Sequence, residues 1–133
     1  MKQLDSTTFV SGQIAPEEIS ALGVTTIVNN RPDGEEPGQP TSDVIEAAAK
    51  AAGIDYRHIP VAGGISLPQV AQMADALAQA QGPVLAFCRS GTRSTYLWAL
   101  ARARLGDDAE ALFEKAAAAG YDLSPVRAFL AQS

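Results

Sequence analysis

The 133-residue chain contains one cysteine, one histidine and few aromatic residues, which make up 6% of the sequence. A single cysteine cannot form a disulfide within the chain. One histidine and one cysteine do not supply the converging ligands that a zinc or iron site needs. We therefore expect no metal and no cofactor. A chain of this length can bury a substantial core without disulfides, which predicts one domain over residues 1–133.

The sequence also lacks a long apolar run and a positively charged, apolar leader. These absences predict a protein of the reducing cytoplasm that does not bind a membrane. No glycine-rich nucleotide-binding loop of either common pattern is present. The net charge of −5 argues against nucleic acid as a partner, because phosphate backbones are bound by broad basic surfaces.

Acidic residues are absent from one stretch of the chain, between Asp75 and Asp107. Four arginines fall inside that stretch: Arg89, Arg93, Arg102 and Arg104. This distribution indicates a local positive site on an acidic protein, suited to a small anion. For Arg102 and Arg104 a position near a helix C-terminus is the simpler interpretation.

Apolar β-branched runs alternate with helical patterns along the chain. The pattern predicts strands over residues 8–12, 24–28, 56–61 and 83–87, and helices over 16–22, 42–52, 67–81, 95–104 and 108–119. Such alternation is typical of a three-layer α/β fold with a mainly parallel central sheet flanked by helices. The loops 29–34, 62–64 and 88–93 should then meet beyond the carboxyl ends of the strands, where such folds bind ligands.

Cys88 follows the apolar run 83–87 and opens the segment CRSGTRS, residues 88–94. A buried strand would carry the sulfur to the sheet edge, and the following helix would point its positive N-terminus at it. We predict a reactive thiolate in an anion-binding loop, with Cys88 and Arg93 as the catalytic residues. The alternative is a small buried core cysteine. The other predicted loop residues are Arg89, Ser90, Gly91, Thr92 and Ser94.

Four segments together resemble landmarks of one family: Ser11-Gly12-Gln13, VNNRPDGE (28–35), HIPVAGG (58–64) and CRSGTRS (88–94). Residues 9–103 are similar to the phosphatase-like domain of the β-lactamase hydrolase-like proteins, within the protein tyrosine and dual-specificity phosphatase superfamily. The resemblance implies a phosphatase-like α/β fold, with Cys88 as nucleophile and Arg93 as the anion-binding arginine. It also suggests a functional link to a metallo-β-lactamase-type persulfide dioxygenase.

The chain departs from that superfamily at two places. Superfamily members have five residues between the cysteine and the arginine, whereas four separate Cys88 from Arg93, as in the rhodanese loop that the string resembles. The loop 62–64 also lacks the aspartate that usually protonates the leaving group. Both departures favour a sulfurtransferase, in which Cys88 takes sulfane sulfur from a small anionic donor such as thiosulfate and passes it to an external thiol or cyanide.

Two other functions remain open. The first is a phosphatase that hydrolyses a phosphoester through a phosphocysteine, with Arg31 and Asp33 as candidates for substrate contact or general acid. For Asp33, in Pro-Asp-Gly, an ordinary turn residue is the favoured interpretation. The second is an inactive module that binds an anion or a partner, in which the Cys88 thiol would keep an ordinary pKa. His58 is expected to be structural.

Overall fold

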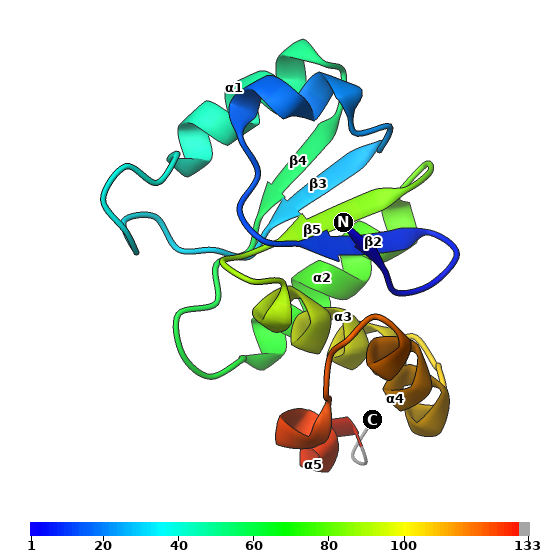
Figure 1. Cartoon of the computed structure of the whole chain (residues 1–133). Coiled ribbons are helices and arrows are strands. Elements are labelled where there is room, and N and C mark those ends of the chain that lie inside the picture. Colours follow the sequence, from blue (N-terminus) through cyan, green and yellow to red (C-terminus); the bar gives the residue numbers. More distant parts are fainter. Residues whose placement is uncertain (131–133) are drawn as a thin grey trace.

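The computed structural model describes residues 1–130 and contains a five-stranded sheet between two helical layers (Figure 1). The strand order is β1-β2-β5-β3-β4. β1 pairs antiparallel with β2, and the other pairings are parallel, so the sheet is mixed. The strands are β1 (Lys2–Gln3), β2 (Thr8–Ser11), β3 (Thr26–Asn29), β4 (Asp55–His58) and β5 (Val84–Phe87).

The prediction of a mainly parallel sheet therefore needs correcting at β1. This strand is two exposed polar residues long and carries no apolar alternation that the sequence could reveal. It precedes β2 at the edge of the sheet and is joined to it by a tight loop, in which the Asp5 carboxylate accepts the backbone N–H groups of Thr7 and Thr8. The α/β class with helices on both faces is confirmed.

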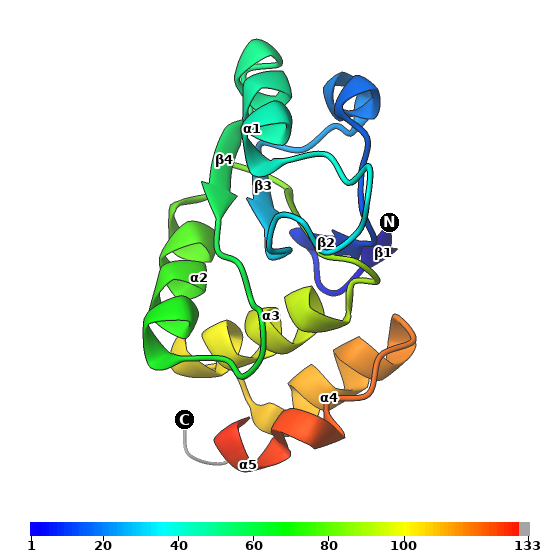
Figure 2. The same cartoon turned by 90° about the vertical axis from the view of Figure 1, so that its left-hand side faces the viewer.

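Two layers of helices cover the sheet, as Figures 1 and 2 show from two sides. One face carries the 3₁₀ helix η1 (Pro16–Ala21) and α1 (Ser42–Ala51). The other carries α2 (Leu67–Gln79), α3 (Thr92–Arg104), α4 (Ala109–Ala118), the 3₁₀ helix η2 (Ser124–Val126) and α5 (Arg127–Leu130). Within residues 1–130 no helix is both long enough and apolar enough to cross a membrane.

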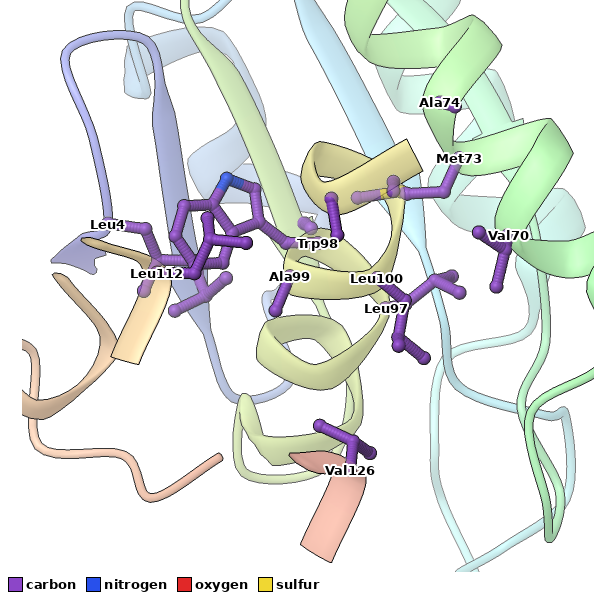
Figure 3. Packing of buried hydrophobic residues seen from close by; sticks show 14 of the residues in the cluster. Leu4, Val70, Met73, Ala74, Leu97, Trp98, Ala99, Leu100, Leu112 and Val126 are labelled. Carbon is purple, nitrogen blue, oxygen red and sulfur yellow. The ribbon is translucent and has the colours of Figure 1, made fainter. Parts of the chain in front are cut away.

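The central strand β5 separates the two hydrophobic cores. Its side chains alternate, so Val84 and Ala86 join the core under α2 and α3, while Leu85 and Phe87 join the core under η1 and α1. Trp98 is completely buried among the residues of the larger core (Figure 3). Packing on both faces fixes the strand that ends one residue before Cys88.

Local capping signals predict several helix boundaries correctly. The Ser66 hydroxyl accepts the backbone N–H of Gln69, whose side chain accepts the N–H of Ser66 in return. Two boundaries differ from the prediction by three residues, more than any other. α3 begins at Thr92 instead of residue 95, which places Arg93 in its first turn, and β4 ends at His58 instead of residue 61. The prediction of one domain over residues 1–133 stays a prediction, and residues 131–133 lie outside the described part.

Candidate active site

The loops that follow β3, β4 and β5 meet at one edge of the sheet, and Asn30 joins them. Its backbone N–H donates to the Phe87 carbonyl at 2.8 Å, and its side-chain amide donates to the Ile59 carbonyl at 3.0 Å. Its own carbonyl accepts the N–H of Val61 at 3.0 Å. Asn30 is completely buried, so these bonds hold the three loops together without competition from water.

Cys88 lies in the centre of this edge with no exposed surface. The Gly91 backbone N–H donates to its Sγ at 3.1 Å. Burial is the largest single influence on the pKa of the Cys88 thiol and raises it. The N–H groups of Ser94, Ser90 and Gly91 and the Ser94 hydroxyl together outweigh burial, so the net pKa lies below the ordinary value. The sulfur is thus surrounded by donors that favour the thiolate.

Two glycines allow the tight course of the loop around the sulfur. Gly91 has a φ of +90°, a left-handed conformation that other residues rarely adopt. A Cβ on Gly91 would collide with the hydroxyl of Tyr121, which donates to the Ser90 carbonyl at 3.1 Å. A Cβ on Gly12 would lie 2.8 Å from the Arg89 carbonyl oxygen. The loop packs so closely against its neighbours at these two positions that neither has room for a side chain.

Arg93 connects the cysteine loop with two other segments. Its guanidinium donates to both carboxylate oxygens of Glu35, at 2.7 and 2.8 Å, and to the Val61 carbonyl at 2.8 Å. The pKa of Arg93 is raised, first by the hydrogen bonds to Glu35 and further by the negative charge and hydrogen bond of Cys88. The guanidinium is therefore held by a carboxylate of the chain itself, and Cys88 is near enough to raise its pKa.

Glu35 and Glu36 bring two more arginines into this cluster. Glu35 Oε1 accepts Arg31 Nε at 2.9 Å, and Glu36 Oε1 lies 2.7 Å from Arg89 Nε and 3.2 Å from Arg31 Nη2. Arg31 is 3% exposed, and its Nη2 makes no hydrogen bond despite this ion pair. The hydrogen bonds of Arg93 are the main reason that the pKa of Glu35 falls to about 2.

This cluster was only partly foreseen from the sequence. Sequence reasoning placed Arg31 near the site but missed Glu35, Glu36 and Asn30. Both Asn30 and Glu35 belong to the VNNRPDGE segment, and that segment was the available signal. Its residues are polar loop positions without periodicity, so only the folded chain shows which of them meet Arg93.

The remaining predicted residues take different places. Ser94 is completely buried, and its hydroxyl donates to Asn30 Oδ1 at 2.8 Å. Ser90 and Thr92 have their hydroxyl oxygens 3.1 Å apart. Asp33 is exposed, and its carboxylate accepts the backbone N–H of Ser42 at 2.8 Å, a contact that stabilises the start of α1.

The lone histidine and the acidic residues do not form a metal site. His58 Nε2 lies 3.0 Å from the Arg31 carbonyl, where it supports the arginine-bearing loop. Within residues 1–130 no group of three or more histidine, cysteine, aspartate or glutamate side chains converges to hold a metal ion. The chemistry available at this edge is that of a thiolate, arginines and backbone N–H groups.

The sequence comparison identifies the family. The sequence model of the phosphatase-like domain of β-lactamase hydrolase-like proteins matches residues 1–105, so the chain belongs to this family. A β-lactamase hydrolase-like protein of Xylella fastidiosa is 40% identical over 122 residues, which cover 86% of this chain and 28% of that protein. The chain thus spans little more than a quarter of the length of that relative.

The structure comparison gives the same class of fold. A crystal structure of a Neisseria meningitidis protein assigned as a phosphatase superposes with a TM-score of 0.82 at 35% identity, covering 98% of this chain and 96% of the other. The active form of Tk-PTP superposes with a TM-score of 0.71 at 19% identity, over 98% of this chain and 92% of the other, which shows the fold alone. The family and the Neisseria neighbour favour the phosphatase alternative over the sulfurtransferase expected from the loop spacing.

Proposed function

We propose that the chain is a cysteine-dependent phosphatase that acts through a phosphocysteine on Cys88. The observation that carries this proposal is the pairing of a buried sulfur, to which backbone N–H groups donate, with the guanidinium of Arg93. A thiolate in that setting is a nucleophile, and an adjacent guanidinium neutralises the oxygens of a phosphoryl group. Membership of a phosphatase-like family supports the same reaction.

The reaction proceeds in two displacements. In the first, the Cys88 thiolate attacks phosphorus, the bond to the leaving oxygen breaks, and the phosphoryl oxygens take the place of the Glu35 carboxylate on Arg93. In the second, water attacks the phosphocysteine, the P–S bond breaks, and phosphate leaves with the thiolate restored. The leaving group departs as an anion that takes its proton from solvent. The attacking water gives its oxygen to phosphate and releases a proton to solvent, so the net reaction is hydrolysis.

The carboxylates near the sulfur suggest the class of substrate. The pKa of Glu35 is about 2, so this group is ionised at neutral pH and has no proton to give. Asp33 accepts the Ser42 N–H at the start of α1. The loop 62–64 carries no carboxylate. We therefore propose substrates whose leaving group departs as a stable anion, namely aryl phosphates and phosphoanhydrides.

The test is hydrolysis of two aryl phosphates by the wild-type chain and by Cys88→Ser. We expect turnover of 4-nitrophenyl phosphate to disappear in Cys88→Ser, since serine lacks the thiolate. We also expect phenyl phosphate, whose leaving group is more basic, to react far more slowly than 4-nitrophenyl phosphate. Equal rates for the two esters would contradict the absence of a general acid. Turnover that survives in Cys88→Ser would overturn the proposal itself.

Sulfur transfer is the second candidate, and the compact loop favours it. Four residues separate Cys88 from Arg93, and the N–H groups of this short loop act on Sγ itself. This arrangement suits a small persulfide on Cys88, because the group that leaves when the persulfide forms needs no proton. Parallel assays of thiosulfate:cyanide sulfur transfer and aryl phosphate hydrolysis distinguish the two functions. Sulfur transfer that is lost in Cys88→Ser, without phosphate release from the wild-type chain, would assign the site to sulfur.

The cytoplasmic location and the link to a metallo-β-lactamase-type enzyme remain proposals. The location and the link are each compatible with phosphate hydrolysis and with sulfur transfer. The names of the relatives point to a hydrolase context, and this chain spans 28% of the Xylella relative. Co-purification of this chain with a metallo-β-lactamase-type protein from its own cells would support the link.

A further inference from the structure

A groove of about 680 Å³ lies on the helical side of the molecule, outside the cysteine loop. Three residues of α3 line it at successive turns: Tyr96, Leu100 and Arg104. Spacings of four residues put these side chains on one face of the helix, over a length of about 12 Å. The facing wall includes Ile65, from the segment between β4 and α2, and Leu67, the first residue of α2. Figure 2 shows that this connecting segment crosses α3 in that view.

The groove begins close to the cysteine loop and runs away from it. Tyr96 lies one helical turn after Arg93, whose guanidinium binds the Val61 carbonyl just before the wall segment. Arg104 lies at the opposite end, in the last turn of α3. Leu100 and Val126, two groove residues that Figure 3 labels, supply apolar surface between these ends. Its volume is that of a small-molecule site.

Among residues 1–130, Arg104 is the one charged residue that lines the groove. It is exposed, and within residues 1–130 no acidic or aromatic side chain pairs with it. Every other arginine of the chain has such a partner: Arg31, Arg57, Arg89, Arg93, Arg102 and Arg127. An unpaired guanidinium at the end of an apolar groove attracts a ligand with an apolar body and one terminal negative charge.

We propose that this groove binds an elongated amphipathic carboxylate, with its apolar chain along α3 and its carboxylate on Arg104. The groove is distinct from the anion site at Cys88, so this proposal does not depend on the phosphatase reaction. The charge on Arg104 selects an anion over a cation of the same chain length. The apolar wall formed by residues such as Leu67 and Leu100 supplies most of the affinity.

The test uses calorimetric titration at neutral pH with decanoate and with decyltrimethylammonium, which share a ten-carbon chain but differ in charge. We expect decanoate to bind at least about fivefold more tightly, the ratio that an exposed ion pair provides. Arg104→Glu should remove this preference, whereas Arg104→Lys should keep it. Lys50→Glu, on an exposed position of α1 across the sheet, makes the same charge change and should leave binding unaltered.

Two further measurements separate the groove from other sites. Leu67 is 78% exposed, so Leu67→Glu is expected to fold and to weaken decanoate binding. Cys88→Ser and added inorganic phosphate should leave decanoate affinity unchanged. Equal affinity for the two probes, or displacement of decanoate by phosphate, would overturn the proposal. Self-association of the chain that Leu67→Glu abolishes, without decanoate binding, would instead assign the groove to a second copy.

Discussion

Replacing Glu35 with glutamine tests the ion-pair cluster that covers Arg93. Glutamine has nearly the shape of glutamate, so Glu35→Gln removes the charge and leaves one oxygen able to accept a hydrogen bond. In the wild-type chain the Glu35 carboxylate accepts two bonds from Arg93 and one from Arg31. The variant should therefore lose the charge of this interaction and at least one of its hydrogen bonds, because an amide NH2 replaces one acceptor oxygen.

The size of the loss follows from the pKa of Glu35, which falls from an ordinary 4.5 to about 2 in the folded chain. Each pKa unit corresponds to about 1.4 kcal/mol, which gives an upper value of about 3 kcal/mol. The Glu35 side chain is 27% exposed, and screening by water reduces such pairs strongly. We expect the free energy of unfolding to fall by about 1 kcal/mol at neutral pH.

The dependence on pH gives the sharper criterion. Because the pKa of Glu35 is depressed on folding, its stabilisation is complete above about pH 4.5 and is lost as the pH falls towards about 2. Urea unfolding of wild type and Glu35→Gln from pH 7 to pH 2.5 should thus show a difference that shrinks in this window. Glu114→Gln, an exposed position on α4, is the control. A difference that stays constant with pH, or that Glu114→Gln reproduces, would refute the reasoning.

Three further changes test the site. Glu35→Gln should also strengthen inhibition by inorganic phosphate, because a neutral glutamine competes with phosphate for Arg93 less well than the Glu35 carboxylate does. Unchanged inhibition would contradict this. Ser94→Ala should raise the pKa of the Cys88 thiol, since the Ser94 hydroxyl helps to lower it in the folded chain, and Ser94→Thr should keep it low. The pH dependence of iodoacetamide alkylation measures both. Gly91→Ala should lower the free energy of unfolding by about 2 kcal/mol, because φ is +90° and the Cβ collides with Tyr121. Gly63→Ala, with open space around it, should cost much less in the same urea titration.

The position of Cys88 could be predicted because its signals are local. The apolar run 83–87, the glycine-containing turn and the helix that follows lie within one short stretch, and strands and helices form from such neighbouring patterns. Their order predicted the α/β class and the meeting of three loops at one sheet edge. β1 could not be predicted, because its two polar residues depend on β2 for their conformation.

The sequence by itself determined the cysteine loop, the layered fold and the family, because apolar periodicity, capping residues and turn residues act over a few positions. Only the tertiary structure decided what surrounds the arginines. Glu35 reaches Arg93 from 58 residues away, whereas Arg104 has no such partner in the described part of the chain and lies at the end of a groove. Contacts of this range depend on how whole segments pack, and loop residues without periodicity carry no local signal of that packing.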